Sequence, residues 1–458
     1  MRNNKRKIIL FAVLFLGAFL LKAWSEESLP PLPKGPLLLT SVTRAQLLPN
    51  YWINRLPDPD LVLKTPDEIK KFNEDIHLAL SNCVDVFKMK LKRPGKSVSK
   101  QIELEYNTVA NRVLWATDDT RIPKKVFEED IKPLVQWEKV PDKINIEWGA
   151  ATRATSVRAL PSDVKMLEKP RDIEFDQLQF TLIKLWTPVA IYHTSVDKKW
   201  YYIQAPYARG WVKAKDIALF KTRDQLKKYV KAENFLVVTG ESIPIYSDSG
   251  LEALEQKISM GTVLPLIKTG NKTYTVSMPD RDVDGSFLPA KAYVNIKSDV
   301  SPGFPAFTQR NIIRQAFKLL GARYGWGGTY NGRDCSGFTH DVFLSLGIDM
   351  PRGSKEQAFV GTQINHYEPY KDEESKTEAL HNAVPGITLL RMPHHQMLYL
   401  GEIEGKFYAI HSTWAERVSM DSDEKNRINQ IVVSDLSLNG NSYLGSLFDR
   451  IISISEIN

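Results

Sequence analysis

The chain has 458 residues, of which 61 are Lys or Arg, 54 are Asp or Glu, and only two are Cys. At about 100–200 residues per domain this length predicts two to four domains, and the balance of apolar, charged, Gly and Pro residues excludes collagenous, coiled-coil and disordered classes. Cys83 and Cys335 lie far apart, which excludes a disulfide framework and a cysteine-rich zinc site, because each needs several cysteines close together.

Residues 1–25 have the features of a secretory signal peptide. Four basic residues precede the apolar run IILFAVLFLGAFLL, and small residues stand just before a cut after Ser25. The run is shorter than the ~18 residues of a membrane helix, although an uncleaved anchor stays open as an alternative. We expect an exported protein of the periplasm or cell envelope, without stable membrane insertion after cleavage. Removing the leader lowers the net charge from +7 to +2 and leaves no basic stripe for phosphates, so no nucleic-acid partner is expected.

Residues 26–140 are predicted to form a helical N-terminal domain, entered through the Pro-rich linker SLPPLPKGP. Thr65, Pro66 and Glu68 have the arrangement of a capping box with proline at the first helical position. Apolar residues then follow at helical spacing: Ile76, Leu80, Val84, Phe87 and Leu91. Cys83 lies beside this stripe, so we expect it to be a core residue.

Residues 141–220 and 221–300 change to short strands in which apolar and polar residues alternate, with a turn at residues 195–198 and a break at Arg209-Gly210. The two blocks have the same succession of strands and turns at similar length, although few residues are identical between them. They resemble paired bacterial SH3-like barrels, and SVRALPSDV resembles the entry to such barrels in cell-wall peptidases. Generic β-modules are the alternative.

Residues 301–458 combine helices with later strands, which predicts an α+β fold. Thr308 is expected to cap a helix that ends before Gly321, and a second helix to run from Ser336 to about residue 346. Ser354 and Gln357 suggest another capping box. Strand patterns follow in HQMLYLG, KFYAIHS and RIISIS.

This last unit holds Cys335 and six of the eight histidines, which are His340, His366, His381, His394, His395 and His411. A lone cysteine with sequence-distant histidines is typical of a thiol nucleophile with a general base. Asp334 can cap the following helix, which would place the sulfur where N–H groups and the dipole favour a thiolate and an oxyanion. A small buried hydrophobe is the alternative role of Cys335.

The segment YGWGGTYNGRDCSGF resembles the nucleophile segment of the NlpC-type cysteine peptidases, usually Y-x-W-G-G followed by D-C-S-G. Further matches come in the family's order: PRGS with Gln357, HQMLYLG, and KFYAIHS. The resemblance covers residues 305–458, and the helical and two-barrel front resembles the subfamily that cuts γ-D-glutamyl bonds. It implies a papain-like catalytic domain and no cofactor.

The resemblance implies that Cys335 is the nucleophile, His395 the general base and His411 the residue that orients the imidazole. Asp334 and Ser336 would contact the substrate, and Tyr324 would lie beside the sulfur near the oxyanion. The segments Pro385-Gly386-Ile387 and Arg391-Met392-Pro393 depart from the family pattern, which leaves the geometry of that loop open.

Strand geometry distinguishes the roles of the candidate histidines. Neighbouring side chains on a strand point to opposite faces, so only one of His394 and His395 can face Cys335, and counting back from Tyr399 selects His395. His340 is expected to be a surface or packing residue. Zinc binding by His394, His395 and His411 is the weaker alternative, because adjacent strand histidines diverge and no HExxH motif accompanies them.

The resemblance therefore predicts a cell-wall hydrolase that cleaves the γ-D-glutamyl–diamino acid bond of peptidoglycan stem peptides. It also implies that Asp334 receives the free amine of L-Ala, so that released peptides are cut and glycan-linked stems are not. The alternative role of Asp334 is helix capping alone. The rival functions are acyl or amide transfer by the same three residues and a non-catalytic wall-binding scaffold. The sequence does not identify the preferred diamino acid, the ligand of the barrels or the oligomeric state.

Overall fold

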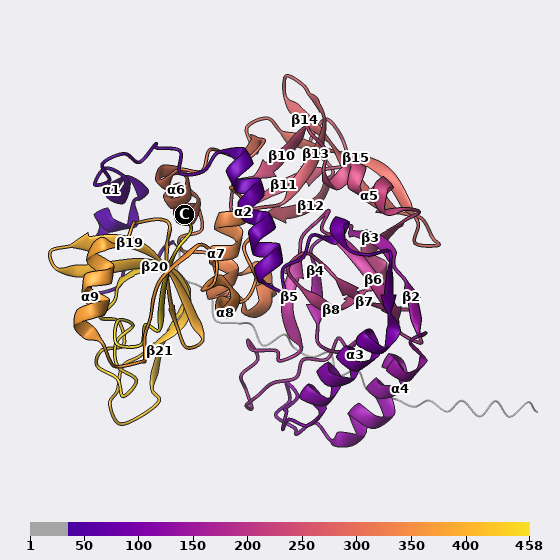
Figure 1. Cartoon of the computed structure of the whole chain (residues 1–458), viewed down its shortest axis with the longest axis horizontal. Helices are drawn as coiled ribbons and strands as arrows, with labels where there is room; N and C mark the ends of the chain where they lie inside the picture. Colours follow the sequence, from indigo (N-terminus) through magenta and orange to yellow (C-terminus); the bar gives the residue numbers. More distant parts are fainter. Residues whose placement is uncertain (1–34) are drawn as a thin grey trace, which may run out of the picture. The chain divides into compact units, whose positions relative to one another are not determined.

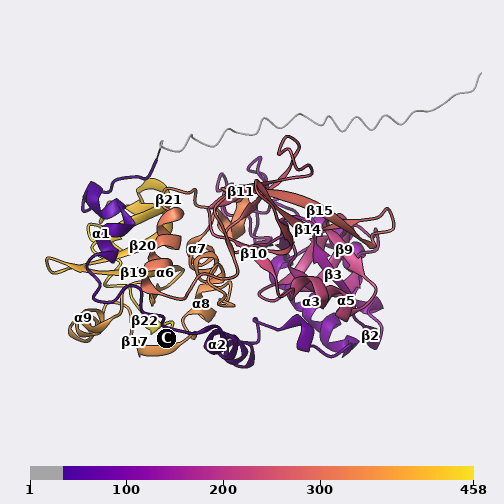
Figure 2. The ribbon, with the colours of Figure 1, turned by 90° about the horizontal axis from the view of Figure 1, so that it is seen from above.

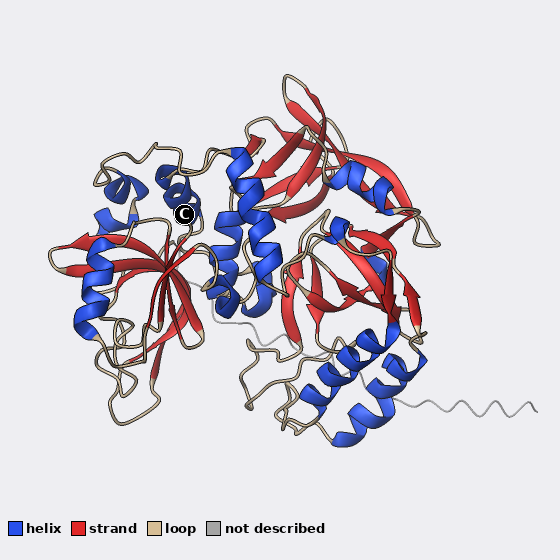
Figure 3. Ribbon diagram, in the orientation of Figure 1, coloured by secondary structure: helices blue, strands red, loops and turns tan. Residues whose placement is uncertain are grey.

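A computed structural model describes residues 35–458, so the predicted leader lies outside the described residues. The described chain contains two seven-stranded sheets, one six-stranded sheet and a pair formed by β1 (Lys92–Pro94) and β2 (Lys143–Asn145) (Figures 1 and 3). None of its helices combines the length and apolar character needed to cross a membrane.

The predicted capping box begins α2 (Pro66–Ala79). The backbone N–H of Thr65 donates to the Glu68 carboxylate at 2.7 Å, and the Thr65 hydroxyl accepts from the Glu68 N–H. The helix ends at Ala79, so the expectation that the stripe continues to Leu91 is wrong. Residues 81–82, Ser-Asn, form a turn instead, and both residue types are common in turns.

The N-terminal helices do not form a domain of their own, which corrects the expectation for residues 26–140. Helices α1 (Pro49–Ile53) and α2, together with buried Cys83, share a core with the last domain, and in both ribbon views α2 lies beside that domain's helices (Figures 1 and 2). Helices α3 (Gly95–Ala110) and α4 (Lys132–Val135) instead pack on the first barrel. Short amphipathic helices bury their apolar faces against the nearest available core.

The first barrel has the strand order β5-β4-β8-β7-β6-β3-β9. Its strands are β3 (Glu147–Ala151), β4 (Thr155–Arg158), β5 (Gln179–Ile183), β6 (Pro188–Thr194), β7 (Trp200–Gln204), β8 (Arg209–Lys213) and β9 (Ile217–Phe220). The turn at residues 195–198 is confirmed, but Arg209 and Gly210 lie inside β8. The break comes earlier, where the Ala205 N–H donates to the Ala208 carbonyl at 2.7 Å.

Helix α5 (Arg223–Val230) leads into the second barrel, whose order is β12-β11-β15-β14-β13-β10-β16. Its strands are β10 (Phe235–Val238), β11 (Ser242–Tyr246), β12 (Leu254–Ser259), β13 (Val263–Thr269), β14 (Thr273–Arg281), β15 (Phe287–Asn295) and β16 (Val300–Pro302). The two barrels share one core: Phe220 of the first stacks on Phe287 of the second with ring centroids 4.1 Å apart. They are therefore packed on each other rather than joined by a free linker.

The last domain confirms the α+β expectation. Thr308 caps α6 (Gln309–Lys318), and α7 (Cys335–Leu344) packs on an antiparallel sheet of order β17-β22-β18-β19-β20-β21. The strands are β17 (Thr362–His366), β18 (Thr388–Met392), β19 (His395–Ile403), β20 (Lys406–Arg417), β21 (Lys425–Asp435) and β22 (Ser453–Glu456), and α9 (Glu373–Asn382) lies between β17 and β18 in the chain.

The prediction of a second capping box, at Ser354 and Gln357, is wrong. Helix α8 (Ser354–Gln357) begins with Ser354 itself, because Gly353 takes the N-cap position. The amide of Gln357 is fully buried and donates to the carbonyls of Ser336 and Pro351 at 2.9 and 2.8 Å. Gln357 therefore ties α8 to the beginning of α7 instead of capping its own helix.

Candidate active site

Asp334 fixes the position of Cys335 at the first residue of α7. One carboxylate oxygen accepts from the Gly337 N–H at 2.8 Å; the other accepts from the Gly327 N–H at 2.8 Å and from Arg352 at 2.6 Å. Contact with the Arg352 guanidinium holds the pKa of Asp334 below its usual value, although burial opposes the shift. The predicted cap is therefore present, and the carboxylate is fully engaged.

The glycine-rich loop before Cys335 is pressed against the first barrel. Gly327 and Gly328 have φ angles of 58° and 84°, and a Cβ on them would come within 2.7 Å of the Gln179 side chain and 2.9 Å of the Leu182 side chain. The Gln179 amide also donates to the Gly327 carbonyl at 2.9 Å. Glycine is needed here both for the left-handed backbone and for the close approach of β5.

The three predicted catalytic side chains come from α7 and from the neighbouring strands β19 and β20. His395 Nε2 lies 2.8 Å from His411 Nδ1, and His411 Nε2 lies 2.9 Å from the Ser434 hydroxyl. This leaves Nδ1 of His395 as the nitrogen that can serve a thiol. The sulfur of Cys335 lies 3.9 Å from the His394 carbonyl, next to the first residue of β19.

Strand alternation is not the reason why His394 and His395 lie in different surroundings. His394 is not part of the strand: it has a φ angle of 63° in the turn between β18 and β19, and its side chain is exposed. His395 begins β19. The choice between them depends on turn geometry that an alternating pattern does not describe.

Burial shifts the pKa values of the thiol and of both imidazoles. Burial raises the pKa of Cys335 to about 12, and the Asp334 carboxylate contributes in the same direction. Burial also lowers the pKa of His395 well below its usual value and that of His411 to about 3. Burial thus opposes the thiolate that the helix N-terminus was expected to favour, and it disfavours the charged form of both imidazoles.

Tyr324 and Ser336 both lie near the N-terminal end of α7. Tyr324 is buried, and its pKa is raised well above the usual value by burial and by nearby Asp334 and Cys335. The Ser336 hydroxyl accepts from Arg352 at 3.0 Å. Arg352, which entered the sequence argument only through the PRGS match, is thus the residue that links Asp334 and Ser336.

The sequence patterns do not reveal a buried network of ion pairs that lies behind α7. Lys184 of the first barrel lies 2.9 Å from one oxygen of Asp341, and Arg333 lies 2.8 Å from the other. Arg333 also donates to the Glu241 carbonyl at the second barrel. These attractions lower the pKa of Asp341 to about 2 despite burial. Both barrels are therefore tied to residues on either side of Cys335, and no local motif marks such pairs.

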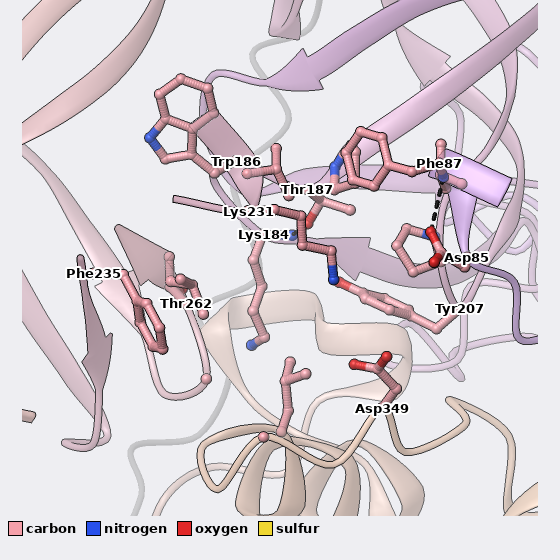
Figure 4. A pocket seen from close by; sticks show the side chains of 18 of the residues that line it. Asp85, Phe87, Lys184, Trp186, Thr187, Tyr207, Lys231, Phe235, Thr262 and Asp349 are labelled. Atoms are coloured by element: carbon pink, nitrogen blue, oxygen red, sulfur yellow. Dashed lines mark hydrogen bonds between the residues drawn. The ribbon is translucent and has the colours of Figure 1, made fainter. Parts of the chain in front are cut away.

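A cavity of about 320 Å³ lies on the far side of this network (Figure 4). Apolar side chains such as Phe87, Trp186 and Phe235 form most of its wall, and Cys335, His395 and His411 do not border it. His340 does: it is buried, its Nδ1 lies 2.7 Å from the Met350 carbonyl, and it is a packing residue rather than a surface one. Residues 35–458 hold no group of three side chains arranged to bind a metal ion.

Comparison with known proteins places these features in a family. Residues 321–436 match the model of the NlpC/P60 family, and residues 165–213 match an SH3 domain of the SH3b1 type. The last domain belongs to the NlpC/P60 family. The resemblance inferred from the motifs is confirmed, as is the assignment of the protein as a cysteine peptidase that acts as a peptidoglycan hydrolase.

Two curated relatives and one solved structure extend the comparison. The gamma-D-glutamyl-L-lysine dipeptidyl-peptidase of Bacillus cereus is 28% identical over 313 residues, which are 61% of this chain and 86% of the relative. The probable endopeptidase p60 of Listeria seeligeri is 47% identical over 60 residues, 12% of this chain and 11% of that protein. An NlpC/P60 endopeptidase structure from Photobacterium damselae subsp. piscicida shares the fold, with a TM-score of 0.74 at 18% identity over 93% of this chain and 99% of that one.

Proposed function

We propose that this NlpC/P60 protein cleaves the γ-D-glutamyl–diamino acid bond of peptidoglycan stem peptides. The observation that carries the proposal is the hydrogen-bonded pair of His395 and His411 beside the first residue of α7, within the NlpC/P60 match. The name of the Bacillus cereus relative supports the type of bond.

In the proposed reaction His395 acts as a true general base. With Nε2–H donating to His411 Nδ1 and His411 Nε2–H donating to Ser434, the lone pair of His395 Nδ1 is free to accept the thiol proton. The sulfur of Cys335 attacks the γ-carbonyl, and backbone N–H groups at the beginning of α7 with Tyr324 stabilise the oxyanion. The imidazolium then protonates the leaving amine, and water hydrolyses the acyl-enzyme.

The proposed substrates carry a free N-terminal L-Ala. Because the oxygens of Asp334 already accept from Arg352, Gly327 and Gly337, an incoming ammonium would share the carboxylate with these donors. These contacts support the capping role of Asp334, and acetylation of the L-Ala amine tests whether it has the second role as well.

Hydrolysis is favoured over acyl transfer. A transferase needs a sheltered acceptor site at the thiol, and the apolar cavity of Figure 4 lies behind α7 and is not bordered by Cys335. We also propose export to the periplasm or cell envelope from the character of residues 1–25; the N-terminal sequence of the mature protein tests this part.

The decisive assay incubates the protein with L-Ala-γ-D-Glu-meso-diaminopimelate, its N-acetylated form and intact sacculi, and identifies the products by mass spectrometry. The proposal expects L-Ala-D-Glu and free diaminopimelate from the first substrate, and little product from the other two. Comparable rates on all three would contradict the free-amine preference, whereas cleavage at another bond would contradict the function.

A further inference from the structure

A second cavity, also of about 320 Å³, lies where the two barrels meet the last domain. The first barrel contributes residues of β5 and the segment after it, the second barrel contributes β11 and β12, and the last domain contributes α7 and the loop before Cys335. Cys335, His395 and His411 do not border it. Four cationic side chains line this cavity: Lys184, Lys257, Arg333 and Arg352.

The buried ion pairs at this cavity contain one more cation than acids. Lys184 and Arg333 share the carboxylate of Asp341, and Arg352 pairs with Asp334. The three cationic side chains are only 11%, 6% and 12% exposed, so they are largely withdrawn from water. A cation in such a place is costly unless an anion balances it. The inner wall of the cavity therefore has one positive charge to spare.

The exposed rim of the cavity does not remove this excess. Lys257 and Glu241 both border the cavity and are exposed, so together they add one charge of each sign. Charges at an exposed rim are also screened by solvent, whereas those of the inner wall are not. The attraction for an anion is thus strongest in the interior.

Two hydrogen-bond donors of the inner wall are unused. Nζ of Lys184 carries three N–H groups and donates to Asp341 at 2.9 Å and to the Ser259 hydroxyl at 3.0 Å, which leaves one. The guanidinium of Arg333 donates through Nε to Asp341 and through Nη2 to the Glu241 carbonyl. Its Nη1 has no acceptor within residues 35–458. Lys184 and Arg333 can therefore each donate to a further oxygen.

His340 places a hydrogen-bond acceptor at the same cavity. Its Nδ1 must carry a proton to donate to the Met350 carbonyl at 2.7 Å, which leaves a lone pair on Nε2 of the neutral ring. The side chain is 2% exposed, and Nε2 has no partner in the described part of the chain. Burial lowers the pKa of His340 to about 4, and the charges of Lys184 and Arg352 contribute to the shift. A ligand that satisfies Nε2 must therefore bring its own proton.

We propose that this cavity binds inorganic phosphate and thereby ties both barrels to the last domain. The anionic oxygens accept from Lys184 and Arg333, and the remaining P–OH group donates to Nε2 of His340. A planar guanidinium suits the oxygens of phosphate. Hydrogen phosphate keeps a hydroxyl at neutral pH, whereas sulfate has none and a phosphate monoester loses its last proton near pH 6. The site therefore selects free phosphate over both of these anions.

The test is titration calorimetry of the purified protein at pH 7 with inorganic phosphate, sulfate or glycerol 3-phosphate. In about 150 mM NaCl, phosphate should bind with a Kd below about 1 mM, and the other two anions at least about tenfold more weakly. Phosphate should also raise the Tm relative to chloride at equal ionic strength. Absence of phosphate binding, or equal affinity for sulfate, would overturn the inference. Equal affinity for glycerol 3-phosphate would overturn the assignment to free phosphate.

Two variants locate the binding site. Lys257→Glu reverses a charge at the rim and should weaken phosphate binding about fivefold. Lys291→Glu is its matched control, because it makes the same change on an exposed position of β15 that does not border the cavity, and it should leave the Kd within about twofold of wild type. Equal losses in the two variants would show binding through overall charge and would overturn the inference.

His340→Phe tests the selectivity. It keeps an aromatic ring against Tyr207, whose ring centroid lies 4.6 Å from that of His340, but it removes the acceptor. The affinity for phosphate should fall to that for sulfate, and the affinity for sulfate should stay unchanged. An unaltered preference for phosphate in this variant would contradict the role of Nε2. None of these measurements uses a wall peptide, so their outcome is independent of the proposed function.

Discussion

The two sides of Cys335 differ in how their charges are balanced. Toward the barrels, the buried Lys184 and Arg333 and the nearly buried Arg352 are paired with Asp341 and Asp334. On the side of β19 and β20, His395 and His411 bond each other and the Ser434 hydroxyl, and burial lowers the pKa of both imidazoles. The ion pairs hold the nucleophile in place, and the imidazoles without an acidic partner supply the proposed base. Stability and catalysis are thus expected to reside on opposite sides of α7.

The largest effect should come from the nucleophile. Cys335→Ser should lower kcat by roughly four orders of magnitude or more, because the hydroxyl is a far weaker nucleophile with the same neutral base. Turnover is measured on the diaminopimelate peptide, with Cys83→Ser as control, since Cys83 is buried in the core shared with α2. A serine variant that stays active would refute the mechanism.

The second largest loss of activity should come from changing the general base. His395→Ala should cost about three orders of magnitude in kcat, whereas His394→Ala, in the exposed turn, should stay within about threefold of wild type. Similar losses for both variants would mean that the roles of the two histidines are misassigned.

The orienting residue should have a smaller effect. His411→Gln keeps a hydrogen-bonding group toward His395 and should retain more activity than His411→Ala, which also leaves the Ser434 hydroxyl without its partner. The comparison uses kcat at one pH and Tm for both variants, and equal kcat values would show that the hydrogen bond does not orient the base.

On the barrel side, breaking the ionic network should affect stability more than specificity. Lys184→Met leaves Asp341 with Arg333 alone and should lower the free energy of unfolding by about 3 kcal/mol, without changing the ratio of rates among peptide substrates. The Asp341 carboxylate, with its pKa lowered to about 2, contributes stability that is present above its unfolded pKa near 4 and is lost as the pH falls toward 2. Unfolding by urea at pH 7 and pH 3 measures both effects. A changed substrate preference in Lys184→Met would contradict the division between the two sides.

The last prediction concerns the rate at which the thiol is labelled. Because burial raises the pKa of the Cys335 thiol to about 12, iodoacetamide should label it more slowly at pH 7 than a free thiol with a pKa near 8.5, and labelling should accelerate about tenfold per pH unit above neutrality. The sequence alone predicts the opposite, fast labelling, from the helix N-terminus. Rates measured between pH 6 and 10 decide between the local and the tertiary effect.

The features predicted correctly are local ones. The caps at Thr65, Thr308 and Asp334 depend on residues three positions apart, and the motif around Cys335 is continuous. The strands that carry His395 and His411 follow from alternation and turns. These signals are complete within short segments of chain, so no knowledge of distant contacts is needed to read them.

The larger errors involve distant partners. Gln357 was expected to cap its own helix and instead bonds the beginning of α7; the N-terminal helices were expected to form one domain and instead pack on two. The thiol's pKa depends on burial rather than on the helix alone.

The most direct test of the account is rapid quenching of the protein with L-Ala-γ-D-Glu-meso-diaminopimelate, followed by mass spectrometry of its peptides. The account predicts an L-Ala-γ-D-glutamyl group attached to the peptide that contains Cys335, with diaminopimelate released at the same rate. An adduct on another residue, or one that contains diaminopimelate, would contradict it.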